Sequence, residues 1–129
     1  MEKEIKKEKK TIEKPIMILY IVLIIAGLMG FGALYYNYRK SKEKTYISNP
    51  KKGDVYSIRL KNGHFSTARV GLIKKDSIYL THNDYEIDLA EKIDEIDIAR
   101  NYSINIQATT QKTLVEQFNK DTIYEITRQ

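Results

Sequence analysis

The sequence of 129 residues has no cysteine and no tryptophan, and it contains only two prolines and two histidines. Without cysteine, the chain cannot carry a disulfide scaffold, a thiol nucleophile, a thiolate zinc site, an iron–sulfur cluster or a lipid-modified anchor. A chain of this length has room for one domain of ordinary size, because domains typically have about 50–250 residues. Large multidomain enzymes are therefore excluded as well.

The remaining reactive side chains form no known catalytic pattern. His64 and His82 lack the i,i+4 spacing of helical metal ligands. The carboxylates of residues 84–97 lack the Asp-x-Asx-x-Asx-Gly loop of a calcium site. No glycine-rich phosphate loop and no Gly-x-Ser-x-Gly motif occurs. We therefore expect a non-enzymatic protein with no catalytic residue, no cofactor and no metal.

The net positive charge of the chain arises from its N-terminal part. Residues 1–14 form a charged tail with six Lys and four Glu, and residues 39–52 carry a net charge of +5. Residues 53–129 contain ten basic and twelve acidic side chains. Because this longest segment is net acidic, we expect no nucleic-acid partner, despite the net charge of +5 for the whole chain.

An uncharged run of 21 residues, 16–36, separates the two basic stretches. A helix of this length spans roughly 32 Å at about 1.5 Å per residue, which matches the hydrocarbon core of a bilayer. Pro15 stands where the first helical turn would begin, and Tyr35 and Tyr36 gather at the other end, as in an interfacial aromatic belt. We predict a single N-terminal transmembrane helix over residues 15–38, in contact with a lipid bilayer.

Several small residues occur within this apolar run. Ala26, Gly30 and Ala33 would share one face of the helix, where they favour close packing of a second membrane helix. Gly30 and Gly32 could also imitate the small-residue site at which a signal peptide is cleaved. A cleaved signal peptide is therefore the alternative interpretation of the run.

Residues 39–52 are polar and basic, and we predict a juxtamembrane linker there. Asn49-Pro50 is a turn signal that disfavours a continuous helix. Four side chains of this segment are the candidates for contact with the membrane surface: Arg39, Lys40, Lys42 and Lys44.

The numbers of basic residues on the two sides of the predicted helix are nearly equal, with six Lys before it and five Lys or Arg close after it. The positive-inside rule therefore does not decide the orientation of the helix. A tail of fourteen residues with ten charges is a poor substrate for translocation. We therefore expect a bacterial inner-membrane protein whose C-terminal domain is exported to the periplasm. The opposite orientation would place the basic segment against anionic lipid of the cytoplasmic leaflet.

Residues 53–129 form the segment that can fold in water, and their pattern predicts a small β-rich domain. Hydrophobic residues alternate over four stretches, 54–61, 64–74, 77–82 and 85–89, which are separated by two-residue turn signals. Asn62-Gly63 predicts a type I′ hairpin, and Gly71 predicts a bulge or a sharp bend. The residues expected to face the core are Tyr56, Ile58, Leu60, Ser66, Ala68, Val70, Leu72, Ile78, Leu80, Tyr85, Ile87 and Leu89.

The pattern is weaker after Ala90. Ile93, Ile96 and Ile98 are compatible with a short helix or another strand. Residues 110–120 predict a helix with Leu114, Val115 and Phe118 on one face and Thr109 or Thr110 as its N-cap, and residues 121–127 predict a final strand. The fold class is thus α+β: an antiparallel meander or a partly open SH3-like barrel, with a C-terminal helix and a final strand.

The runs at residues 49–56, 76–79 and 83–86 resemble those of a group of small single-pass membrane proteins of Bacteroidota bacteria. Those proteins are similar in having a short hydrophobic helix before a β-domain that opens with Pro-x-x-Gly-Asp-x-Tyr. The resemblance implies the same architecture and carries no activity with it.

Tyrosine is abundant in the predicted domain, and Tyr56, Tyr79 and Tyr85 are candidates for a partner groove, since SH3-type barrels bind extended peptides on such residues. High strand propensity alone also explains them. The interpretation that fits best is a membrane-anchored interaction module that presents its domain to a protein partner, or to a second copy, in a bacterial envelope assembly. The alternative is a membrane-tethered sensor whose barrel binds a peptide or small ligand.

Overall fold

The computed structural model describes the backbone of residues 2–129 and the side chains of residues 14–102 and 104–129. These residues form two compact units, which divide between Lys40 and Ser41. The first unit is helical. The second unit contains a β-sheet, the helix α2 and the end of the first helix.

The segment predicted as a juxtamembrane linker is helical over most of its length, because the helix α1 (Glu2–Ser48) runs through it. The helix ends only at Ser48, directly before the Asn49-Pro50 turn signal. Its last two turns belong to the second unit, where Ile47 is fully buried and Glu43 is 3% exposed. Tertiary burial of these side chains thus extends the helix into a segment that looks polar in sequence.

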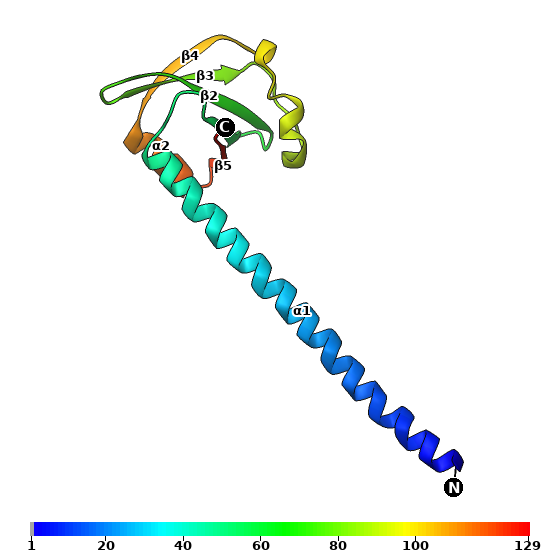
Figure 1. The fold of residues 1–129 in the computed structure, drawn as a ribbon. Helices are drawn as coiled ribbons and strands as arrows, with labels where there is room; N and C mark the ends of the chain where they lie inside the picture. Colours follow the sequence, from blue (N-terminus) through cyan, green and yellow to red (C-terminus); the bar gives the residue numbers. More distant parts are fainter. Residues whose placement is uncertain (1) are drawn as a thin grey trace. The chain divides into compact units, whose positions relative to one another are not determined.

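The second unit is built on one antiparallel sheet with the strand order β4-β3-β2-β1-β5 (Figure 1). The sheet is open, because β4 and β5 are its opposite edges and do not pair with each other. The elements are β1 (Val55–Arg59), β2 (Phe65–Lys74), β3 (Ser77–Asn83), β4 (Tyr102–Thr110), α2 (Gln111–Asn119) and β5 (Ile123–Thr127).

The predicted core face of the first three strands is confirmed. Tyr56, Ala68, Val70, Ile78 and Leu80 are all buried in one cluster. The predicted helix and final strand are confirmed as α2 and β5, which contribute Leu114, Phe118, Ile123 and Ile126 to this cluster together with Ile47 of α1. Both helices therefore cover the same face of the sheet.

The bulge predicted at Gly71 is confirmed by the pairing of β2 with β3. Val70 pairs with Leu80, whereas Ile73 pairs with Ile78, so β2 has an extra residue in this interval. The extra residue changes the alternation of side chains along the strand. Leu72, which was expected to face the core, is consequently 55% exposed.

The hairpin between β1 and β2 lies where it was predicted, but its turn type differs. A type I′ turn requires positive φ at both central residues, and here φ is positive at Gly63 (+85°) and not at Asn62. The Gly63 N–H donates to the Leu60 carbonyl (3.1 Å), and the Leu60 N–H donates to the His64 carbonyl (2.8 Å). This pattern is a three-residue loop that ends in a bulged glycine.

Gly63→Val should lower the free energy of unfolding by roughly 1–3 kcal/mol, because a β-branched residue is strained at positive φ. A steric clash would not contribute to this loss of stability, since a Cβ at Gly63 would meet no atom within 4 Å. Gly63→Asn is the matched control and should cost less, because asparagine tolerates this region. Urea unfolding of both variants measures the difference, and equal losses would contradict the backbone explanation.

The predicted fourth strand, residues 85–89, is wrong. This segment forms one isolated bridge, in which Phe65 and Ile87 exchange backbone hydrogen bonds of 2.7 and 2.8 Å. Two short 3₁₀ helices follow, η1 (Ala90–Glu95) and η2 (Ala99–Asn101), so the helical alternative at Ile93 was correct. Tyr85 and Leu89 are exposed, and the actual fourth strand is β4 (Figure 1).

Candidate interaction surface

The first unit presents an apolar helical surface. The stretch Lys14–Ser48 is the one helix of the described residues that is long and apolar enough to cross a membrane, and its most apolar window has a mean hydropathy of 2.5. No part of that window is buried. Apolar side chains exposed all around a helix are unfavourable in water.

The candidate packing face on this helix consists of Ala26, Gly30 and Ala33. Their spacing places them on one side of α1, and all are exposed. A Cβ built at Gly30 would meet no atom within 4 Å in the described structure. The face is therefore open to a second helix, and its use remains a prediction.

The candidate lipid-contact residues lie on helix rather than on an extended linker. Arg39, Lys42 and Lys44 are exposed, and Lys40 is partly buried. The ammonium of Lys40 lies 6.0 Å from the ring centroid of Tyr36, and that of Lys42 lies 5.8 Å from the ring of Tyr46. These are cation–π distances. Contact of the four side chains with lipid remains a prediction.

The predicted tyrosine groove does not form. Tyr56 is fully buried, because it faces the helices from the middle of the sheet. Tyr79 lies on the opposite face of the sheet, since it alternates with the buried Ile78 and Leu80. Tyr85 lies outside the strands and is 59% exposed. Burial raises the pKa of the Tyr56 phenol, and the charge of Asp54 raises it further.

A largely buried ion pair joins Arg128, directly after β5, to Asp54, directly before β1. The guanidinium of Arg128 donates two hydrogen bonds to the Asp54 carboxylate, from Nε to Oδ1 (2.8 Å) and from Nη2 to Oδ2 (2.7 Å). Asp54 is 1% exposed. Arg128 Nη2 also donates to the carbonyls of Asn49 (2.9 Å) and Tyr46 (3.4 Å), and its guanidinium stacks 4.1 Å from the Tyr46 ring centroid.

We call this group of four residues, Tyr46, Asn49, Asp54 and Arg128, the Arg128 latch. Hydrogen bonding to Asp54 raises the pKa of Arg128 further above its usual value, so the guanidinium stays charged. Because the cation caps the last carbonyls of α1, it also opposes the negative end of the helix dipole. The latch fixes the last turn of α1, the loop before β1 and the end of β5 to one another.

A polar network covers part of the opposite face of the sheet. The Tyr102 hydroxyl donates to Asp97 Oδ1 (2.6 Å) and also bonds Thr67 Oγ1, while Arg69 Nη2 donates to the same Asp97 oxygen (3.0 Å). Asn83 Nδ2 donates to Thr67 Oγ1 (3.0 Å) and to the Ile96 carbonyl (2.7 Å). Thr67 and Asn83 are buried, so the network pins the segment between β3 and β4 to the sheet.

This network shifts the pKa values of Arg69 and Tyr102, the two titratable partners of Asp97. Burial lowers the pKa of Arg69, but the hydrogen bond and the charge of Asp97 outweigh that effect, and the net pKa is raised. Burial raises the pKa of Tyr102, and its hydrogen bond to Asp97 raises it further. Arg69 therefore remains charged and Tyr102 remains a neutral donor at neutral pH, as a structural network requires.

The two histidines lie apart in different surroundings. His64 Nδ1 is 2.7 Å from Glu86 Oε1, which also accepts a hydrogen bond from Asn62. These hydrogen bonds lower the pKa of Glu86. Burial lowers the pKa of His82, which lies on β3. Among the described residues, no group of three or more His, Cys, Asp or Glu could hold a metal ion.

The strand β4 is an exposed edge of the sheet, which the weak sequence pattern after Ala90 did not predict. It pairs with β3 on one side only, because it is the first strand in the sheet order. Ile104 is 90% exposed and Ile106 is 60% exposed. The alternation of these isoleucines with polar residues was the available signal. An edge strand offers unpaired backbone groups to another chain, so β4 is a candidate contact surface.

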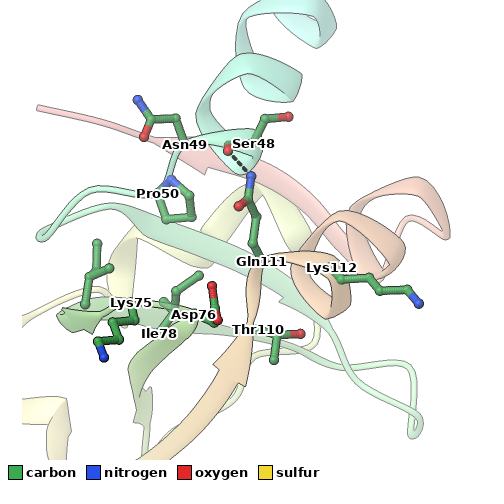
Figure 2. A pocket seen from close by; sticks show the side chains of 10 residues that line it. Ser48, Asn49, Pro50, Lys75, Asp76, Ile78, Thr110, Gln111 and Lys112 are labelled. Carbon is green, nitrogen blue, oxygen red and sulfur yellow. Dashed lines mark hydrogen bonds between the residues drawn. The ribbon is translucent and has the colours of Figure 1, made fainter.

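An open pocket of about 390 Å³ lies where the loop after α1 meets the β2–β3 turn and the start of α2 (Figure 2). Gln111 Nε2 donates across its rim to the Ser48 carbonyl. Ile73 and Ile78 supply apolar lining, and Lys75 and Lys112 supply positive charge. The pocket mixes small apolar and polar areas without a cluster of reactive groups.

No family model matches the chain, and no curated protein and no solved structure matches it.

Proposed function

We propose that this chain is a single-pass, non-enzymatic anchor of a bacterial inner membrane, which holds a small β-rich domain for contact with a protein partner in an envelope assembly. The observation that carries the proposal is a helix that is apolar on all sides and exposed along its span, joined in one chain to a domain with its own packed core. A bilayer is the environment that satisfies both parts.

The exposed strand β4 supports an interaction function over a ligand-binding one. Proteins recognise extended chains by adding a strand to a free sheet edge, and β4 offers such an edge with two exposed isoleucines. The pocket beside α2 is the observation in favour of the second candidate, a tethered sensor for a small ligand or peptide. Its open rim and few convergent polar groups fit that function less well.

The SH3-like comparison and the resemblance to membrane proteins of Bacteroidota belong to the same proposal. In an SH3-like arrangement, four strands form a meander and a fifth returns to the first, and the order β4-β3-β2-β1-β5 supports this comparison. The long bulged strand β2, which pairs on both sides, would be the point where such a barrel bends. The proposed orientation places this domain in the periplasm.

Alkaline carbonate extraction tests the anchoring. The full chain should stay in the membrane pellet, and Ile24→Arg with Leu28→Arg should release it, because each charge at the helix centre costs about 2.5–3.5 kcal/mol on insertion. The matched control is Ile104→Arg with Ile106→Arg, which adds the same charges to an exposed strand and should stay in the pellet. Release of the unaltered chain would contradict the proposal.

The orientation is measured in the same membranes with a cysteine at an exposed position, since the natural chain has none. Lys61→Cys should react with an impermeant maleimide in cells whose outer membrane alone is permeabilised. Labelling that requires lysis of the inner membrane would reverse the orientation and would leave the anchoring proposal standing.

A further inference from the structure

The edge of β4 lacks charges and prolines, two of the protections that usually keep sheet edges from pairing, although its pairing with β3 shifts register between Tyr102 and Ile106. From Asn101 to Gln111 the sequence contains no charged residue and no proline. The strand is nine residues long, and its isoleucines at 104 and 106 are exposed. Natural edge strands are usually short, or are blocked by charges, prolines or bulges. A long uncharged edge of this kind is expected to be covered in the assembled protein.

The other edge strand of the sheet, β5, has the short length and the charges that β4 lacks. It is five residues long, contains Glu125, and lies between Asp121 and Arg128. Arg128 is held in the latch. Charge and short length therefore protect β5, and β4 remains the edge that is suited to pairing.

The charges at the two ends of β4 have opposite sign. The segment before the strand, residues 91–100, carries four acidic and two basic side chains. The end of the strand pairs with Ser77, beside the turn that contains Lys74, Lys75 and Asp76, and it leads into Lys112. An antiparallel partner of the same sequence would place the acidic end of one copy near the basic end of the other.

We propose that β4 pairs antiparallel with β4 of a second copy of this chain, about a two-fold axis that passes beside Asn105. This inference rests on the proposed function, since it names the protein partner of the anchored domain. It joins the two sheets edge to edge, and such an isologous contact closes on itself.

The register follows from the exposed side chains. With Asn105 opposite its own copy, Ile104 of each chain faces Ile106 of the other, so four β-branched side chains meet on one face. Copies held in one membrane also meet at a raised effective concentration, which favours a modest contact area. The self-complementary pattern of one strand therefore identifies the second copy as the occupant.

Disulfide cross-linking of full-length protein in carbonate-washed membranes tests this register. Asn105→Cys places two cysteines opposite each other, at a Cα–Cα distance of about 4.5 or 5.5 Å for the two kinds of antiparallel pair, and both distances allow a disulfide. The matched control is Gln107→Cys, at a position that is also exposed. In the proposed register the two cysteines at position 107 would be offset by four residues along the strands, which separates them by roughly 13 Å. Asn105→Cys should give at least about tenfold more cross-linked dimer under mild oxidation.

A triple variant provides the second arm. Ile104→Lys and Ile106→Lys added to Asn105→Cys should abolish the cross-link, because lysines would then face lysines across the axis. Unchanged urea unfolding would show that the domain remains folded, as expected from the exposure of both isoleucines.

Three results would overturn the inference. They are equal cross-linking at positions 105 and 107, a membrane-bound Asn105→Cys chain that forms no dimer, and a membrane-bound Asn105→Cys chain that links to a different protein. Absence of the chain from the washed membranes would instead contradict the proposed anchoring, so the two failures are distinguishable.

Discussion

Asp54→Asn should lower the free energy of unfolding of the domain by about 3–5 kcal/mol, the usual cost of removing one member of a buried ion pair. The Asp54 side chain is 1% exposed and receives both hydrogen bonds of the Arg128 guanidinium. The substitution keeps the size of the side chain but leaves a largely buried cation without its counter-charge. The last carbonyls of α1 would also lose a firmly held capping group.

Urea unfolding in mild detergent, followed by the near-ultraviolet circular dichroism of the tyrosines, measures this loss. Asp88→Asn is the matched control, because it makes the same chemical change at an exposed residue, and it should stay within about 0.5 kcal/mol of the parent. The double variant Asp54→Asn with Arg128→Gln should lose less than the sum of the single losses, as residues that act as a pair do. Additive losses would show that the latch does not act as a unit.

Ile47→Ala should cost about 2–5 kcal/mol, the range for truncating a buried large aliphatic side chain. Ile47 is fully buried in the cluster that contains Leu114 and Ile126, so its loss leaves a cavity between α1, α2 and the sheet. Ile104→Ala removes the same atoms from a side chain that is 90% exposed and should be nearly silent. Equal effects of the two changes, measured by urea unfolding, would show that the last turn of α1 is not part of the core.

The parts of the fold that the sequence predicted depend on local patterns. Alternating hydrophobic residues identify β1, β2 and β3, and the turn signals lie directly between these strands. The N-cap threonine and the spacing of Leu114 and Phe118 identify α2. In each case the residues that decide the structure are neighbours in the chain. Periodicity and capping are local properties, so they can be recognised without knowledge of the tertiary structure.

The errors occurred where distant residues decide the structure. Residues 85–89 alternate like a strand, but they form only a single bridge, to Phe65, and the polar network around Asn83 and Asp97 holds the segment that follows. The place beside β3 is taken by β4 instead. Both segments alternate, so local propensity could not choose between them.

The same limit applies to the candidate surface. Tyr56 fits a groove by residue type, yet its strand lies between β2 and β5 under the helices, and it is buried. The Arg128 latch joins residues that are far apart in sequence, and no spacing rule relates Arg128 to Asp54. Hydropathy predicted the apolar helix well, because a membrane-length run is a property of one continuous segment.

The pairing of β1 with β5 also sets an order for events during biosynthesis. Val55 pairs with Thr127, whereas the hairpins β1–β2 and β2–β3 connect near neighbours. Chains grow at about 5–20 residues per second, and contacts between distant residues form more slowly than local ones. We therefore expect the apolar helix to emerge and the hairpins to form while β1 still has a free edge. The core closes only after β5 and Arg128 have left the ribosome, so the apolar helix has emerged before the domain that follows it finishes folding.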